Sequence, residues 1–332
     1  MPQSPPQPET IARLFDAVYP SFAMLAGMEL DLFTPLEDGP LTGEQLADAI
    51  GVQAIKLKPL LYALVVAGLL TVEDELFSNT AEADHYLVRG RPAYLGGLQD
   101  LTSSNWNRML RAAENVRAGG PQAKLDYHAP SQDEMVALFR GLYPGAVADA
   151  HKLMKHFDFS TFDSLLDVGG GSGALAIAIA QANPHLRATV LELPSVAPIT
   201  RRFIDEANIS DRVAFFASDA IHDSLRGSYD VVVARHVTQV LSEKDSRALL
   251  SNLATVLKPG GMIHLVGWIL DDSRMSPENI VGYNLVLLTA YQDGQAYTEQ
   301  EYHEWLAEAG FAAFERVVLP DGASILTAHK PE

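Results

Sequence analysis

A run of small residues in the middle of the chain has the composition of a nucleotide-binding turn. Residues 167–173 read Asp-Val-Gly-Gly-Gly-Ser-Gly, and the apolar stretch 165–168 that leads into them is typical of a buried strand. Glycines at the carboxyl end of such a strand remove Cβ atoms, so that a ligand can lie against the backbone. Gly169, Gly171 and Ala174 also satisfy the spacing of the dinucleotide fingerprint. The turn alone therefore predicts nucleotide binding and leaves the cofactor open.

Three carboxylates narrow the choice of cofactor. Glu192 ends the second expected strand, where a carboxylate can accept hydrogen bonds from two ribose hydroxyls. Asp219, in Ser218-Asp219-Ala220, ends the third strand and could accept a hydrogen bond from an adenine amino group. Asp167 precedes the first glycine by two residues, so it can hold the turn or reach a cationic ligand through water. Glu192 suits either cofactor, whereas the positions of Asp167 and Asp219 favour an adenosyl sulfonium over a nicotinamide dinucleotide. The dehydrogenases that use the dinucleotide also need a proton relay that we do not recognise here.

Strands and helices alternate from Ser164 onward, as in a doubly wound parallel sheet. We expect five strands and intervening helices, then a helix capped by Thr298 and Glu301, and a closing pair of strands turned at 320–322. The expected strands are 165–168, 188–191, 213–217, 229–234, 262–269, 312–319 and 324–329. A final hairpin on a parallel sheet is an unusual and informative ending.

The first hundred residues predict a different kind of unit. Thr42 and Gln45 form a capping box, Gly51 ends the short helix that follows, and a second helix spans 55–67 before a small hairpin. Helix, turn, helix and hairpin is the winged-helix order, which often binds DNA. Charge argues against that use, because residues 1–100 carry fourteen acidic side chains and only five basic ones (Arg13, Lys56, Lys58, Arg89 and Arg91). We therefore expect a packing or dimerising role.

Composition narrows the partners further. The 332-residue chain has a net charge of −18, which repels phosphate backbones and anionic lipid, so nucleic acid and membrane surfaces are poor partners. It has no cysteine, and its His and Asp groups lack a convincing third ligand, so we expect no metal site. Residues 1–10 do not resemble a signal peptide, and the apolar run 57–70 is too short to span a bilayer. We expect a soluble, cytoplasmic protein.

Together these motifs resemble the class I S-adenosylmethionine-dependent methyltransferases, and the whole chain resembles the O-methyltransferase family of plant and bacterial secondary metabolism. Supporting segments are Phe157-Asp158-Phe159 before the glycine strand, Lys258-Pro259-Gly260-Gly261 before the fifth strand, and 297–301. The resemblance implies an all-α winged-helix-like dimerisation domain (1–100), connecting helices that line the substrate pocket (101–158) and a Rossmann-like catalytic domain with a seven-stranded sheet (159–332). It also implies a homodimer, a small-molecule substrate and S-adenosyl-L-methionine as cofactor.

The resemblance also implies cofactor contacts, residue by residue. The turn would face the methionine part of the cofactor, Glu192 and Leu193 the ribose, and Asp219 and Ala220 the adenine, while Arg235 falls where the family has a basic residue beside the cofactor. The predicted cofactor-binding residues are Asp167, Gly169, Gly170, Gly171, Gly173, Glu192, Leu193, Asp219, Ala220 and Arg235.

Two departures from the family pattern concern the catalytic base. Four residues after the basic position the family has a His that removes a phenol proton, whereas this chain has Gln239, and a neutral amide cannot take a proton. Where the family has a Glu supporting that His, this chain has Ala296, and Asn284 stands where many relatives have Asp. His236 follows Arg235 directly, and on a continuing helical or extended path we expect it to point away from Gln239.

The loss of base and support suggests transfer by proximity and desolvation. The acceptor would then be a thioether, a carbon, a nitrogen, an ionised carboxylate or an acidified hydroxyl, oriented by Gln239 and Asn284. An alternative is an S-adenosylmethionine-binding enzyme that hydroxylates, decarboxylates or catalyses a pericyclic step, and an NAD-dependent oxidoreductase is a more distant one. The predicted pocket side chains are Trp106, Phe139, Tyr143, His236 and Tyr291.

Overall fold

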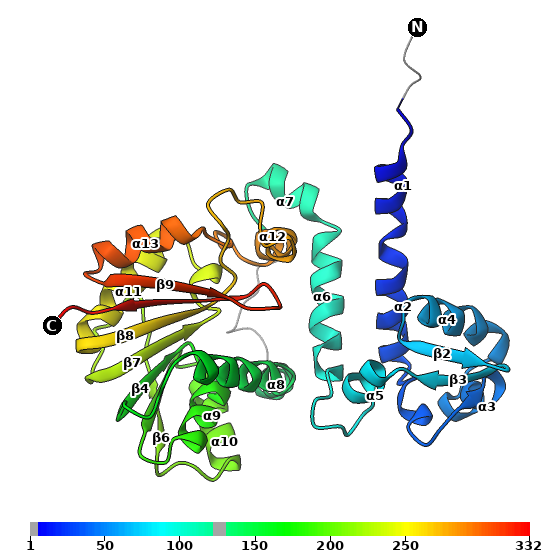
Figure 1. The fold of residues 1–332 in the computed structure, drawn as a ribbon, viewed down its shortest axis with the longest axis horizontal. Helices are drawn as coiled ribbons and strands as arrows, with labels where there is room; N and C mark the ends of the chain where they lie inside the picture. The colour runs from blue at the N-terminus through cyan, green and yellow to red at the C-terminus, as the bar shows by residue number, and fades with distance from the viewer. Residues whose placement is uncertain (1–5, 122–130) are drawn as a thin grey trace, which may run out of the picture. The chain divides into compact units, whose positions relative to one another are not determined.

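The computed structural model describes residues 6–121 and 131–332. The chain divides into two compact units, Met1–Ser103 and Ser104–Glu332 (Figure 1). The predicted connecting segment, 101–158, falls almost entirely within the second unit.

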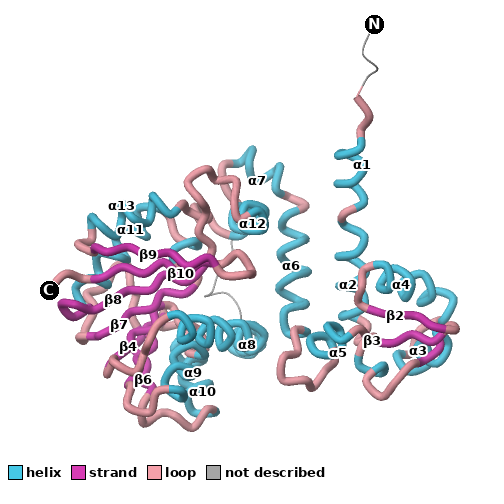
Figure 2. Tube along the Cα trace, viewed as in Figure 1, coloured by secondary structure: helices cyan, strands magenta, loops and turns pink. Residues whose placement is uncertain are grey.

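The second unit is built on one seven-stranded sheet with the order β6-β5-β4-β7-β8-β10-β9 (Figure 2). Strands β4 to β8 pair in parallel, and β10 pairs antiparallel with both β8 and β9. This confirms the predicted parallel sheet with a terminal antiparallel hairpin. The strands are β4 (Ser164–Val168), β5 (Arg187–Glu192), β6 (Val213–Ala217), β7 (Tyr229–Arg235), β8 (Leu257–Gly267), β9 (Ala312–Val318) and β10 (Ser324–His329).

Helices cover both faces of this sheet, which is why its central strands are almost wholly apolar. One core cluster joins the sheet to α8 (Gln132–His156), α9 (Ala174–Ala182) and α10 (Ala197–Glu206). A second cluster joins the other face to α11 (Glu243–Val256) and α13 (Glu299–Glu308) (Figure 1). The remaining helices are α6 (Gln99–Met109), which spans the division between the units, α7 (Ala112–Ala118), η3 (Thr238–Val240) and α12 (Glu278–Ala290).

Strand register brings four chain segments to one edge of the sheet. Val168, the last residue of β4, pairs with Leu191 of β5 on one side and with Ala234 of β7 on the other. Arg235 of β7 pairs with Val266 of β8. The segments that follow β4, β5, β7 and β8 therefore begin side by side, which is where ligands bind in open parallel sheets.

The first unit is mainly helical, and its three strands form a small sheet with the order β1-β3-β2. The predicted Thr42 capping box is present, and Gly51 ends α3 with a φ of 72°. The elements are α1 (Glu9–Asp16), α2 (Val18–Glu29), η1 (Thr34–Leu36), β1 (Leu41–Thr42), α3 (Gly43–Ile50), α4 (Ala54–Val66), β2 (Leu70–Glu73), β3 (Leu76–Asn79), α5 (Ala81–Leu87) and η2 (Gly96–Leu98).

Within the described residues, no single helix is long and apolar enough to cross a membrane. Helices α3 and α4 reach the required length and composition only together, and the chain bends by 110° between them. Both supply side chains to the core of the first unit, including Leu46, Leu57 and Leu61. Their apolar character is thus accounted for by packing.

Candidate active site

The turn after β4 requires glycine for two reasons: its backbone has positive φ angles, and neighbouring side chains leave no room for a Cβ. Gly169, Gly171 and Gly173 have φ values of 62°, 57° and 74°, a region that side chains other than glycine rarely adopt. A Cβ on Gly171 would lie 2.4 Å from Cε1 of Phe139, and one on Gly169 would lie 2.7 Å from Cγ2 of Val237. The turn is therefore closely covered by α8 and by the segment that follows β7.

Asp167 lies fully buried beneath this turn. Its Oδ2 accepts a hydrogen bond from the backbone N–H of Ala176 at 3.3 Å, whereas its Oδ1 has no partner among the described residues. Burial, with a smaller contribution from the nearby Glu192 carboxylate, raises the pKa of Asp167 to about 7, although the hydrogen bond from Ala176 and the charge of Arg235 act in the opposite direction. A Cβ on Gly170 would lie 2.6 Å from Oδ2. The carboxyl group thus holds the turn and keeps one oxygen for a further polar partner.

Glu192 ties the second strand to the same turn. Its Oε2 accepts a hydrogen bond from the N–H of Gly171 and its Oε1 accepts one from the N–H of Leu193, both at 2.8 Å. Burial raises the pKa of Glu192 although both of these hydrogen bonds favour the ionised form. Two carboxyl groups therefore lie close together beneath a closely packed turn.

Asp219 is engaged within its own turn. Its Oδ1 accepts hydrogen bonds from the N–H groups of Ile221 and His222, and its Oδ2 lies 2.9 Å from Nδ1 of His222. Burial alone would raise the pKa of Asp219, but these hydrogen bonds outweigh it and the net pKa is lowered. The carbonyl of Ala220 accepts a hydrogen bond from Asn252. The predicted adenine contact of both residues stays a prediction.

Arg235, at the end of β7, is held by a carboxylate that the sequence analysis missed. Its Nε donates to Oδ2 of Asp149 on α8 at 2.7 Å, and Lys152 donates to the other oxygen of Asp149 at 3.0 Å. Burial would raise the pKa of Asp149, but the charge of Arg235 and its hydrogen bonds lower it. Asp149 stands among the buried Ala146, Ala150 and Leu153 at helical spacing, and an Asp on an apolar helix face was the signal available.

The prediction that His236 points away from Gln239 is wrong. Nδ1 of His236 lies 3.3 Å from Oε1 of Gln239. His236 leaves β7 with a φ of 55°, so the chain takes neither of the regular paths that the prediction assumed. The short 3₁₀ turn η3, which contains Gln239, begins two residues later at Thr238. The imidazole therefore lies beside residue 239.

Gln239 and Asn284 both use their side-chain oxygens to hold backbone. Oε1 of Gln239, which is 2% exposed, accepts a hydrogen bond from the N–H of Trp268 at 3.1 Å. Oδ1 of Asn284 accepts one from the N–H of Ala296 at 2.7 Å. Within the described residues, the hydrogen bonds of both side chains go through these oxygens. The amide N–H groups therefore remain the donors that each can offer a ligand.

Aromatic side chains gather around His236. The ring centroid of Trp268 lies 4.6 Å from that of His236 and 3.6 Å from that of Tyr283 on α12. Neither Trp268 nor Tyr283 was predicted, because an aromatic residue after a strand or on an apolar helix is ordinary core in sequence. Burial raises the pKa of Tyr283 beyond its usual range.

The predicted pocket residues lie in three places. Phe139 covers Gly171, and Tyr143, one helical turn further along α8, stacks on Phe203 of α10 at 5.6 Å. Tyr291, at the end of α12, adjoins the Gln239 segment, since a Cβ on Gly294 would lie 2.8 Å from Cβ of Tyr291 and 2.9 Å from the Gln239 carbonyl oxygen. Trp106 lies half-buried on α6.

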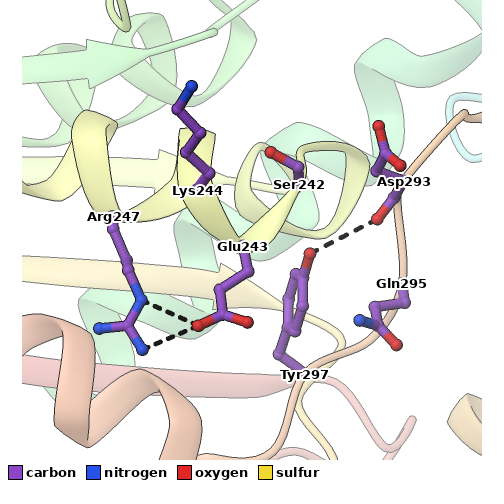
Figure 3. A pocket seen from close by; sticks show the side chains of 7 residues that line it. All are labelled: Ser242, Glu243, Lys244, Arg247, Asp293, Gln295 and Tyr297. Carbon is purple, nitrogen blue, oxygen red and sulfur yellow. Dashed lines mark hydrogen bonds and ion pairs between the residues drawn. The ribbon is translucent and has the colours of Figure 1, made fainter.

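A surface hollow of about 620 Å³ lies beside this region and contains none of the predicted site residues (Figure 3). The side chains that line it each carry a polar or charged group, and Lys244 points away from the Glu243–Arg247 ion pair (Figure 3). It is lined by Ser242, Glu243, Lys244, Arg247, Asp293, Gln295 and Tyr297. The described residues include no group of three metal-ligating side chains here or elsewhere. The predicted site residues therefore lie outside this hollow.

Comparison with known families gives two matches that together cover most of the chain. Residues 12–89 match the O-methyltransferase dimerisation domain, and residues 110–312 match the O-methyltransferase domain. The second match alone spans more than half of the 332 residues.

Proteins with similar sequences carry names that describe methyl transfer to oxygen, to nitrogen or to carbon. The tetracenomycin polyketide synthesis 8-O-methyltransferase TcmO of Streptomyces glaucescens is 29% identical over 98% of this chain and 97% of its own. The N,N-dimethyltransferase OxyT of Streptomyces rimosus is 30% identical over the same shares. The L-tyrosine C(3)-methyltransferase of Streptomyces lavendulae is 29% identical over 89% of this chain and 85% of its own.

Solved structures share the fold over nearly the full length. Human N-acetylserotonin methyltransferase in complex with SAM superposes with a TM-score of 0.86 at 24% identity and covers 100% of both chains. An O-methyltransferase from Nostoc punctiforme superposes with a TM-score of 0.85 at 23% identity, over 98% of this chain and all of that one. The chain thus belongs to the O-methyltransferase family and is an S-adenosyl-L-methionine-dependent methyltransferase that acts on small molecules.

Proposed function

We propose that the edge formed by the ends of β4, β5 and β7 binds S-adenosyl-L-methionine, and that the methyl group is transferred to an acidified hydroxyl of an aromatic small molecule. The observation that carries this proposal is the unpartnered Oδ1 of buried Asp167 beneath a turn that only glycine fits. Strand β7 adjoins β4 directly, so Gln239 and His236 follow the neighbouring strand end.

The residues present fit the cofactor. The glycines allow close approach to the backbone, and Asp167 offers an oxygen toward positive charge, directly or through water. Arg235 is balanced by Asp149, so it adds little repulsion toward a cation. When bound, the cofactor supplies a sulfonium methyl group that is already a strong electrophile.

What remains for this chain is to bring the acceptor close and to exclude water. Trp268 and Tyr283 form an apolar wall beside Gln239, and the amide N–H groups of Gln239 and Asn284 can orient the acceptor by hydrogen bonds. Gln239 itself accepts no proton. An acceptor hydroxyl that is more acidic than an ordinary phenol fits this environment.

We also propose that the chain works as a homodimer joined through its first unit. Helices α1 and α2 leave an apolar stripe exposed at helical spacing, and no residue of α1 is buried. Residues 12–89 match a dimerisation domain, which supports the same use. The exposed side chains are Ile11, Leu14, Phe15, Val18, Tyr19 and Phe22.

Methyl-labelled S-adenosylmethionine tests the acceptor. We would incubate it with the protein and a matched pair of acceptors, a hydroxynaphthoate and the corresponding aminonaphthoate, and identify products by mass spectrometry. The proposal predicts a labelled methyl ether and an equal amount of S-adenosylhomocysteine. Label on the amine alone, or an acceptor altered without gaining a methyl group, would contradict it.

A further inference from the structure

His236 occupies an unusual position for a surface-loop imidazole. It follows β7 in the left-handed conformation, its backbone N–H donates to the carbonyl of Val266 at 2.8 Å, and its ring packs against Trp268. Its side chain keeps 23% of its surface exposed. The ring is therefore fixed in place and still reachable by a ligand.

The hydrogen bonds around Gln239 determine which nitrogen of this ring carries the proton. The N–H of Trp268 can only donate, so the Gln239 atom that faces it at 3.1 Å is the oxygen. The same oxygen lies 3.3 Å from Nδ1 of His236, so Nδ1 must be the donor in that contact. In a neutral imidazole the other nitrogen, Nε2, then carries the lone pair.

Among the described residues, Nε2 of His236 makes no hydrogen bond. Oδ2 of Asp149 lies 3.9 Å from it, which is longer than a hydrogen bond, and Asp149 is already bound to Arg235 and Lys152. An imidazolium formed at His236 would face this carboxylate. The arrangement is that of a base held by one neighbour and charge-balanced by another.

We propose that Nε2 of His236 accepts the proton of the acceptor hydroxyl, and that Gln239 is the positioning residue that holds its tautomer. The inference rests on the proposed function. As the hydroxyl oxygen forms its bond to the methyl carbon, the carbon–sulfur bond of the cofactor breaks and its electron pair stays on sulfur. The hydroxyl proton passes to Nε2 and then to water. The base thus stands three residues before the position at which the family resemblance places it.

The charged groups around His236 shift its pKa and so determine the pH range in which its ring is unprotonated. Burial and the charge of Arg235 lower the pKa of His236 to about 4, while Asp149 and, from the turn between β9 and β10, Asp321 oppose this. Lys152 contacts both of these carboxylates. The ring is therefore unprotonated at neutral pH, the form in which Nε2 can accept a proton.

The tautomer can be measured without a substrate. In the protein bound to S-adenosylhomocysteine and labelled with ¹⁵N-histidine, we expect the His236 signals, assigned by their loss in His236→Asn, to show a protonated Nδ1 and an unprotonated Nε2 across pH 6 to 8. Gln239→Leu should shift the equilibrium toward protonated Nε2. A protonated Nε2 in the unaltered protein would overturn the proposal.

Kinetics test the proton transfer. Asn tolerates positive φ and can still donate to Gln239, but it lacks Nε2, so His236→Asn should lower kcat with the hydroxynaphthoate by about 100-fold or more. Its affinity for S-adenosylhomocysteine and its melting temperature should stay close to those of the unaltered protein. His151→Asn, at an exposed position on α8, is the matched control.

The outcomes separate this inference from the proposed function. If His236→Asn keeps kcat within threefold of the unaltered protein, the inference fails and methyl transfer to the hydroxyl stands. If the unaltered protein itself methylates no hydroxyl, the proposed function fails, and the inference fails with it. If His236→Asn no longer binds S-adenosylhomocysteine, we would measure His236→Gln instead. The inference then fails if His236→Gln keeps kcat within threefold of the unaltered protein.

Discussion

Asp167 and Glu192 place two carboxyl groups beneath one glycine turn, and burial raises the pKa of both. Asp167 is not placed for stability alone, because its Oδ1 has no partner among the described residues, and a buried carboxyl group with an unpartnered oxygen lowers stability. We therefore expect Asp167 to favour ligand binding while it lowers the stability of the folded protein.

The pH dependence of unfolding tests this description of Asp167. Its pKa in the folded protein, about 7, lies above its ordinary value of 3.8, so between these pH values the folded state binds more protons than the unfolded one. Stability should therefore fall as pH rises from about 4 to about 7, by at most about 1.4 kcal/mol per unit from this group, and level off above pH 7. Asp167→Asn should lack this contribution.

The measurement is chemical denaturation of both proteins at half-unit steps between pH 4.5 and 8.5. The free energy of unfolding of Asp167→Asn, minus that of the unaltered protein, should increase as the pH rises to about 7. A difference that stays constant over this range would show that Asp167 is ionised in the folded state throughout.

The same residues show what sequence could and could not predict about the site. The turn at 167–173, Glu192 at the end of β5 and Asp219 after β6 follow from residue type and from the strand ends, which are local signals. The contact of Asp149 with Arg235 joins positions 86 residues apart, and nothing local specifies it. The orientation of His236 depends on a positive φ at a residue other than glycine, which sequence patterns do not reveal.

At the scale of elements, Arg316 on β9 joins the end of β8 to the start of α13. Its side chain is 5% exposed and donates to the carbonyl of Ile269 at 2.8 Å, to Asp271 at 2.9 Å and to Glu299 at 3.0 Å. The segment between these partners carries α12, and with it Tyr283 and Asn284. One buried cation thus fixes both ends of a wall of the proposed site.

Removing the buried guanidinium of Arg316 should lower the free energy of unfolding far more than removing an exposed guanidinium. Arg316→Met removes the hydrogen bonds of a buried guanidinium to the carbonyl of Ile269 and to the partly exposed carboxylates of Asp271 and Glu299. We expect the free energy of unfolding to fall by about 3 kcal/mol. The control is Arg247→Met, which breaks the ion pairs with Glu243 and Glu308 on the surface and should cost about 1 kcal/mol or less. If chemical denaturation gave equal losses of unfolding free energy for the two variants, the structural role that we give to Arg316 would be contradicted.

Sequence predicted the elements well, because alternating apolar strands and capped helices are local signals. The predicted strands 213–217 and 324–329 coincide with β6 and β10. The fifth strand was predicted to begin at Met262, but β8 begins at Leu257. Pro259, Gly260 and Gly261 hid its start, because such residues usually mark a turn. Here they lie in an irregularity of the strand: Leu257 pairs with Tyr229 of β7, and the pairing resumes at Met262.

For the whole molecule, the exposed apolar stripe on α1 and α2 predicts assembly. Phe15 is 72% exposed, more than any other side chain in that stripe. Phe15→Glu should convert a dimer of the 36.0 kDa chain into monomers, because a charge would be buried without a partner at the contact. Met275→Glu, at an equally exposed apolar position in the second unit, should leave the dimer intact. Light scattering after size exclusion distinguishes these outcomes, and a Phe15→Glu protein that stays dimeric would contradict the proposed interface.

The claim that the glycine turn binds the cofactor is tested most directly by calorimetric titration with S-adenosylhomocysteine. Gly171→Ala adds a Cβ at a φ of 57° and 2.4 Å from Phe139, whereas Gly119→Ala adds one at a φ of 74° in open space. We predict that the unaltered protein and Gly119→Ala bind S-adenosylhomocysteine with similar affinity, and that Gly171→Ala binds it at least about tenfold more weakly, a loss of about 1.4 kcal/mol. Equal binding by all three proteins would place the cofactor elsewhere, and no binding by the unaltered protein would contradict the account.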